Sequence, residues 1–565
     1  MKWPLNWPAT PRRPSASTLW VALVTALVAT PVVVVAAHIG KESGGLWSHL
    51  ASTVLPVYLR NTLWLGLGVA LLTTVVGVAT AWLVTLCRFP GQRTLRWALL
   101  LPLAIPAYLG AYAYTDLLQF SGPVQTWLRE VFGWGARDYF FPDVRSLGGA
   151  IVILSLALYP YVFLAARTAF LEQSVCVLEV SRTLGLGPWR SFLRVALPLA
   201  RPSIIAGLAL VLMETLAEFG AVQYCAVDTF ATGIYRTFTL PDRHALTAAA
   251  QLSACLLLLI LVLLTVESAA RRAARFHHMS TRYRQLPSWR LHGWRAAAAS
   301  IVCALPVLLG FAVPLGLFLA KTLRGGDARA RETFVEIGRN SFLLAALSAT
   351  LAVLLAMAVA FGQRLEPTPL NRLLARGAGI GYAIPGAVIA VGLLIPLTWI
   401  DVRVAQWLEG LMDQRAPLLL TGTAAALVYG YQTRFLAVSL NLLQASLTRI
   451  RPTLDGAART LGASPFQMLR RVHIPMLRGS LLAAGLLVFV DVIKELPATL
   501  ILRPFNFDTL AVRVYQLASD ERLDEASTGA LAIILVGLLP VILLSRMLDR
   551  SRPGSDDDPI DGTLP

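Results

Sequence analysis

The stretch "SRTLGLGPWRSFLRVALP", residues Ser181 to Pro198, is polar and basic and is interrupted by glycine and proline. A close copy, "ARTLGASPFQMLRRVHIP", occurs at Ala458 to Pro475. Aligning Arg182–Ala221 with Arg459–Ala498 needs no gap at an offset of 277 (182 to 459), and fifteen of the 40 pairs are identical. An ungapped repeat of this length indicates a chain built from two copies of one unit.

Outside these copies the chain is strongly apolar. Of its 565 residues, 56% are hydrophobic and 14% are charged, whereas soluble proteins average about 45–50% apolar and about 25% charged residues. Because lipid offers backbone amides no partner, and the alternating pattern of a membrane barrel is absent, the predicted fold is an all-α polytopic membrane protein. Twelve stretches can cross a hydrocarbon core of about 30 Å as helices, near residues 18–38, 61–86, 97–118, 147–170, 202–221, 245–267, 297–320, 341–362, 377–400, 417–443, 479–496 and 527–547.

Each copy contains six of the predicted spans. "RNT" at Arg60 matches "RNS" at Arg339, and "IP" at Ile105 matches "IP" at Ile384, both at an offset of 279 (60 to 339). Because six is even, both copies begin and end on the same side, which predicts a pseudo-two-fold axis along the membrane normal. The predicted organisation is an N-terminal tail 1–17, a first unit 18–269, a basic linker 270–296, a second unit 297–548 and a C-terminal tail 549–565.

The net charge of +17 is concentrated in connections on one side of the membrane. The positive-inside bias therefore places both termini and both copies of the repeat in the cytoplasm. We interpret the excess as an orientation signal with affinity for anionic lipid, not as a nucleic-acid site. The first apolar run, of about 20 residues, exceeds a usual signal-peptide core and predicts an uncleaved span. The arginines behind the bias are Arg88, Arg93, Arg96, Arg271, Arg272, Arg275, Arg282, Arg284, Arg290 and Arg295.

The repeated segment predicts two short helices joined by a sharp turn. Ser464 followed by Pro465 is typical of a helix start, because the hydroxyl can cap exposed amides and proline needs no donor in the first turn. Gly187 and Pro188 occupy the same positions in copy one. Gly462, like Gly185 in copy one, is predicted to end the preceding helix in the left-handed conformation.

The second short helix of copy one is predicted to be amphipathic. Trp189, Phe192, Leu193 and Ala196 fall at i, i+3, i+4 and i+7, which places them on one helical face. One interpretation is an interfacial helix that lies among lipid headgroups. The alternative is a docking surface, since a motif presented twice by two-fold symmetry suits a two-fold partner.

Both segments resemble the EAA loop of permease subunits of binding-protein-dependent ABC transporters. Glu179, Val180 and Ser181 stand at its E-A-A positions in copy one, whereas copy two has Gly456 in place of the glutamate, with Asp455 one residue earlier. The resemblance implies that loops 174–198 and 451–475 couple to an ATPase subunit. It assigns this role to Glu179, Gly185, Pro188, Pro198, Asp455, Ala457, Ala458, Gly462, Pro465 and Pro475.

Three longer stretches resemble the fused, twelve-span permeases for ferric iron, which are built from MetI-like units. They are "YPYVFLAARTAFLEQS" from Tyr159, "AEFGAVQYCAVDTFATGIYRTF" from Ala217 and "DVIKELPATLILRPFNFDTLAVRVYQLASDERLDEAS" from Asp491. The resemblance extends from about residue 18 to 550 and implies a ferric iron permease in a bacterial inner membrane. Fused permeases for thiamine and 2-aminoethylphosphonate are organised alike and remain alternatives.

The chain has no G-x-x-x-x-G-K-[ST] phosphate loop. It is therefore expected to be a transport subunit that binds no cofactor itself, with ATP and Mg²⁺ used by a separate subunit. The resemblance implies two ATPase copies and a periplasmic binding protein. Its predicted landing surface is the periplasmic connections 39–58, 119–146, 222–244, 321–339, 401–416 and 497–526. An ion-coupled secondary transporter and a sensor scaffold are the competing classes, and both are disfavoured by the coupling loops.

Four carboxylates lie within or beside predicted spans, where ionisable residues are functional candidates. Glu214 aligns with Asp491, and Glu218 aligns with Glu495, so symmetry predicts that all four approach the two-fold axis. They form a possible translocation path for a cation. The structural alternative is that they bind backbone at helix breaks, or that Lys494 and nearby arginines neutralise them. The seven histidines show no i, i+4 ligand spacing, and no metal site is assigned.

Overall fold

The computed structural model describes residues 15–172, 183, 187–273, 289–325, 331–412 and 417–550, and these are almost entirely helical. In the first half the elements are α1 (Ala16–Ala37), α2 (Leu46–Thr53), α3 (Leu55–Leu86), β1 (Cys87–Arg88), α4 (Gln92–Ala98), the 3-10 turn η1 (Leu101–Ala104), α5 (Ala107–Leu118), α6 (Pro123–Phe132), α7 (Leu147–Glu172), α9 (Pro188–Ser191), the π-helical turn η2 (Phe192–Ala196), α10 (Leu197–Ala217), α11 (Gly220–Tyr224), α12 (Phe230–Phe238) and α13 (Ala245–Ala273).

The second half begins after β2 (Trp289–Arg290), which pairs in parallel with β1. Its elements are α14 (Trp294–Val307), η3 (Leu308–Ala312), α15 (Val313–Arg324), α16 (Arg331–Leu365), α17 (Pro369–Ala378), η4 (Gly381–Ala383), α18 (Gly386–Met412), α19 (Ala424–Thr448), α20 (Pro452–Thr460), α21 (Pro465–Met468), η5 (Leu469–His473), α22 (Ile474–Lys494), α23 (Pro497–Leu502), α24 (Leu510–Ser519) and α25 (Leu523–Arg550).

Among the described residues, ten helices are long and apolar enough to span a membrane, and a bent pair makes an eleventh. The predicted span 97–118 corresponds to this bent pair, in which the chain bends by 92° between Gln92–Ala104 and Ala107–Phe132. The predicted span 417–443 corresponds to α19, which starts only at Ala424 and is too polar to count by composition. It nevertheless packs between α16 and α22.

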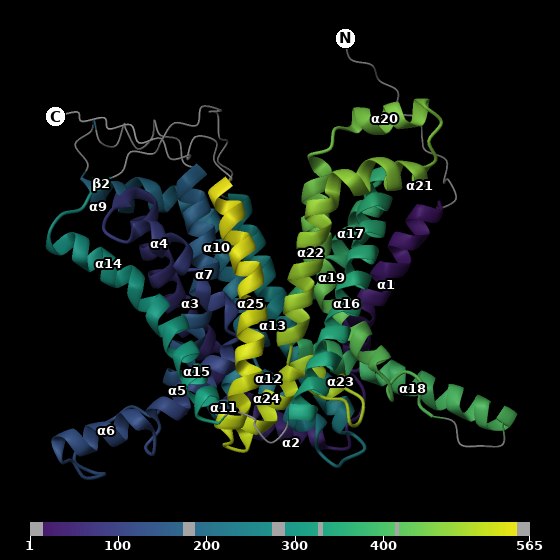
Figure 1. Cartoon of the computed structure of the whole chain (residues 1–565). Helices are drawn as coiled ribbons and strands as arrows, with labels where there is room; N and C mark the ends of the chain where they lie inside the picture. The colour runs from purple at the N-terminus through teal and green to yellow at the C-terminus, as the bar shows by residue number, and fades with distance from the viewer. Residues whose placement is uncertain are drawn as a thin grey trace.

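The irregular elements recur in both halves, as the sequence repeat predicts. A π-helical turn precedes α10 and α22 at equivalent positions, Phe192–Ala196 and Leu469–His473. A 3-10 turn ends just before each Ile-Pro pair and interrupts the third predicted span of each half. Figure 1 shows two groups of helices that diverge toward the end carrying α20 and converge at the opposite end, where α11, α12, α23 and α24 lie.

The first span of each half packs against the other half. The N-terminal helix α1 lies on α16, α17 and α18, where the Thr25 hydroxyl donates to the Leu374 carbonyl at 2.9 Å. Its start is held by Glu366, whose pKa is lowered by hydrogen bonds from Ser15 and Thr18. In the reciprocal contact α14 packs on α3 and α4, and α15 packs on α5. The two sequence units are therefore interlocked in space.

Candidate functional sites: the coupling loop and a charged cavity

The repeated segment of the second half forms the predicted helix–turn–helix. Gly462 adopts a φ of 77°, the left-handed conformation that ends α20. The Ser464 hydroxyl accepts from the backbone N–H of Gln467 at 3.3 Å, and the Gln467 side chain accepts from the N–H of Ser464 at 3.0 Å. This reciprocal capping box, followed by Pro465 in the first turn, confirms the helix start.

In the first half only part of this loop lies within the described residues. Glu179 and Gly185 lie outside them. The described part begins α9 at Pro188, which confirms the helix start predicted from Gly187 and Pro188. Pro198 and Pro475 both lie in the first turn of the following long helices, α10 and α22.

The predicted apolar face of copy one is divided. Trp189 and Leu193 are 66% and 60% exposed, whereas Ala196 is fully buried. Phe192 packs on Trp82 with ring centroids 4.7 Å apart. The physical reason is the π-helical turn that starts at Phe192, because its wider i to i+5 winding breaks the 3.6-residue period.

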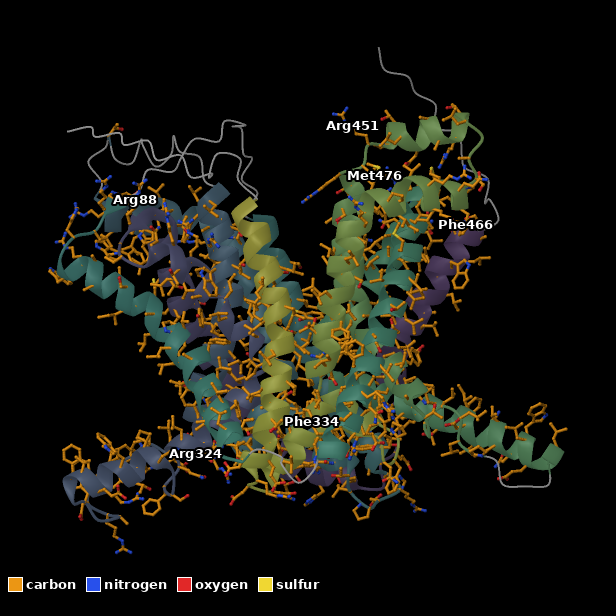
Figure 2. The ribbon with its side chains drawn as sticks, in the orientation of Figure 1. Arg88, Arg324, Phe334, Arg451, Phe466 and Met476 are labelled. Atoms are coloured by element: carbon orange, nitrogen blue, oxygen red, sulfur yellow. The ribbon has the colours of Figure 1, made fainter. Side chains whose placement is uncertain are left out.

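One exposed aromatic residue is common to both coupling loops. Phe466 aligns with Trp189 at the offset of 277 and is 69% exposed. It lies on α21, at the end of the molecule that Figure 2 shows uppermost. Each half therefore presents an uncovered ring at the first turn of the helix that leads into the membrane.

Asp455 points into the protein instead of toward a partner. Its carboxylate lies 2.7 Å from Arg364 Nε and 3.1 Å from His473 Nε2, and its side chain is 14% exposed. Arg364 also donates to the carbonyls of Leu447 and Ile450. The contacts brace α20 against α16 and the end of α19. Gly456 is exposed, and a side chain at that position would meet nothing within 4 Å.

The second site is a cavity of about 130 Å³ at the ends of α10 and α22. It lies at the interrupted third spans, since Ile105 and Pro106 from one half and Tyr382 from the other contribute to its wall. The structure brings together all four carboxylates singled out in the sequence. The polar lining residues are Tyr108, Tyr161, Glu214, Glu218, Tyr382, Arg434, Asp491, Lys494 and Glu495.

Two of the four carboxylates cap short helices. Glu218 accepts from the N–H of Ala221 at 2.8 Å, at the start of α11. Glu495 accepts from the N–H groups of Ala498 and Thr499 at 3.1 and 3.0 Å, at the start of α23. For this pair the contacts match the structural alternative, in which the carboxylates bind backbone where a helix breaks.

The other charges of the cavity are distributed unevenly between the halves. Arg434 pairs with Glu495 at 2.9 Å, and Lys494 pairs with Asp491 at 2.9 Å. Both cations come from the second half, and the residue aligned with Lys494 is Ala217. Within the described part of the chain Glu214 forms no ion pair, and it lies beside the Tyr382 hydroxyl.

Arg434 was not predicted as a site residue. Its signal was present in the sequence, since an arginine inside the predicted span 417–443 is expensive in lipid and is a functional candidate by default. The sequence does not reveal which residue pairs with Arg434, because its partner Glu495 lies 61 residues away on another helix.

Comparison with known proteins finds similarity to transport permeases. Residues 77–275 match the family described as "Binding-protein-dependent transport system inner membrane component". The chain is 25% identical over 548 residues, 95% of its length, to 99% of the Fe(3+)-transport system permease protein FbpB 2 of Haemophilus influenzae. It is also 25% identical, over 87% of its length, to 88% of the probable ABC transporter permease protein y4fN of Sinorhizobium fredii. A 146-residue stretch is 34% identical to 60% of the molybdenum transport system permease protein ModB of Escherichia coli and covers 26% of this chain.

Proposed function

We propose that the chain is a multi-pass inner-membrane permease of a binding-protein-dependent ABC importer and that it carries ferric iron into the cytoplasm. ATP hydrolysis on two copies of a separate subunit drives the step, and a periplasmic binding protein delivers the ion. The similarity over almost the full length of an Fe(3+)-transport permease supports this cargo. The relatives that transport molybdenum or sulfate match only parts of this chain.

The observation that carries the proposal is the continuity between coupling loop and cavity. From Pro465 to Lys494 the chain is one run of helical residues, about 45 Å long at about 1.5 Å per residue. An equivalent run extends from Trp189 to Ala217. Asp491 and Lys494 lie at the cavity end of the run Pro465–Lys494. Glu214 lies near the cavity end of the run Trp189–Ala217. Movement of the docked loops is thereby transmitted to the cavity.

The cavity suits a cation on electrostatic grounds. A trivalent ion in a region of low dielectric is strongly stabilised by nearby negative charge. Four carboxylates face two basic side chains, so the lining carries an excess of acidic groups. The ion pairs Arg434–Glu495 and Lys494–Asp491 neutralise the carboxylates of the second half. Glu214 is therefore the carboxylate best placed to face the passing ion.

We expect Glu214→Gln to lower iron uptake by proteoliposomes that contain the permease, its ATPase and the loaded binding protein. The double variant Glu214→Gln/Asp491→Asn should lower it further, while membrane insertion and ATPase binding stay unchanged. Glu130→Gln, which alters an exposed carboxylate of α6 outside the cavity, is the matched control. Unchanged uptake in the double variant would contradict a role for these carboxylates in the path.

The two coupling loops should differ at their acidic positions. Glu179→Ala is expected to reduce ATP hydrolysis stimulated by the loaded binding protein clearly more than Asp455→Asn. The reason is that Asp455 already binds Arg364 and His473 within the chain. The complex should still assemble in both variants, with one permease and two ATPase subunits by light scattering.

An equal loss of hydrolysis in the two variants, at equal thermal stability, would show that Asp455 replaces the missing glutamate. A ratio of one permease to one ATPase would contradict the proposal of two docking loops. Gly456→Glu provides a gain-of-contact variant, since the position is exposed and has open space around it.

A further inference from the structure

Two segments project sideways from the helix groups, at the end opposite α20. We name them the first lateral arm, residues 120–140 around α6, and the second lateral arm, residues 399–412 of α18 with 417–421. Figure 1 shows that α6 and the outer part of α18 extend in opposite directions, away from the centre where α11, α12, α23 and α24 lie. Both follow the interrupted third span of their half.

The first lateral arm is amphipathic and internally braced. Val124, Trp127, Leu128 and Val131 share one face of α6 by helical spacing. On the polar side, Gln125 donates to the carbonyl of Leu118 at 2.8 Å. The Tyr139 hydroxyl donates to Gln125 Oε1 at 2.7 Å and accepts from Arg129 at 3.0 Å, which ties the returning chain to the helix.

The second lateral arm is braced by a buried carboxylate. Asp401 is 1% exposed and accepts from the backbone N–H groups of Leu419, Leu420 and Thr421 at 3.0, 2.8 and 2.6 Å. These bonds hold the returning chain against α18. Farther out, Trp407 and Leu411 are 67% and 64% exposed and lie one turn apart on the same face.

The two arms share a surface chemistry although their sequences differ. In the first, the Arg129 guanidinium lies 4.4 Å from the ring centroid of Phe120. In the second, the Arg403 guanidinium lies 4.0 Å from that of Trp399. Exposed aromatic rings beside arginines are typical of the membrane–water interface, where the ring meets acyl chains and the cation meets phosphate.

We propose that both lateral arms lie in the headgroup region of the bilayer and anchor the interlocked halves against tilt. Apolar side chains are also exposed on α15 and α16, among them Leu319, Leu323 and Phe342. Figure 2 shows side chains projecting from both arms at the level of Arg324 and Phe334, the facing ends of α15 and α16. Residues 119–146 and 401–416 then leave the predicted landing surface for the binding protein.

Paramagnetic accessibility of the full chain in phospholipid nanodiscs tests this proposal. In a background without the five cysteines, single nitroxides are attached at Trp127→Cys and Trp407→Cys. Val131→Cys and Leu411→Cys are second positions on the same faces. Glu130→Cys and Glu409→Cys are the matched controls on the polar faces. We expect molecular oxygen to relax the four apolar-face labels more than a water-soluble nickel chelate does, and the order to reverse at the controls.

Stronger relaxation by the nickel chelate at the four apolar-face positions would overturn the proposal. So would protection that appears only when the binding protein is added, because the arms would then serve a protein partner. The experiment uses no transported ion, so its outcome is independent of the cargo.

Discussion

Arg434→Met is expected to destabilise the folded protein by about 3–5 kcal/mol, because removing one partner of a buried ion pair leaves the other charge uncompensated. The side chains of Arg434 and Glu495 are 11% and 2% exposed, and they lie 2.9 Å apart. Glu495 also caps α23, so the stranded carboxylate would weaken that helix start. Thermal unfolding of the purified chain in detergent measures the loss.

A double-mutant cycle identifies the ion pair as the cause. Arg434→Met/Glu495→Gln should recover much of the lost stability, because Gln can still accept from the N–H groups of Ala498 and Thr499. Arg403→Met, which alters an arginine of the second lateral arm, is the control and should change the unfolding temperature little. Equal destabilisation in the double variant and in Arg434→Met would mean that the pair contributes nothing beyond the space that Arg434 fills.

Gly381→Ala is expected to prevent correct packing of the second half. A Cβ at Gly381 would lie 1.8 Å from the carbonyl oxygen of Thr433, so the backbones of η4 and α19 must separate. The cost should exceed the about 1–3 kcal/mol usual for overpacking, because a backbone carbonyl cannot rotate away as a side chain can. The displaced Thr433 precedes Arg434, so the cavity would change as well.

Gly379→Ala is the matched control for this variant. Its nearest neighbour would be the Arg376 carbonyl oxygen at 3.4 Å, and its φ of −83° suits any residue. We expect Gly379→Ala to elute as a monodisperse peak in size-exclusion chromatography and Gly381→Ala to aggregate or to yield little folded protein. Equal yields of folded protein from the two variants would contradict the close packing of η4 on α19.

The local features of this protein could be predicted from its sequence. Apolar runs of span length predict helices because lipid leaves the backbone no other partner. Ser464, Pro465 and Gly462 predict a turn and a helix start because capping and left-handed geometry depend on neighbouring residues alone. The offset of 277 predicts that irregular elements recur, and the π-helical turns do.

Only the tertiary structure decided which residues meet across the chain. It placed α1 on the second half and α14 on the first. Apolar runs cannot specify this exchange, because the sequence does not show which apolar face meets lipid and which meets another helix. It turned Asp455 toward Arg364, 91 residues away, although both are ordinary charged residues in the sequence. It also gave the four aligned carboxylates different surroundings, because pairing depends on distances between helices and not on positions along them. Glu218 and Glu495 cap helices, Glu495 and Asp491 form ion pairs, and Glu214 faces the cavity.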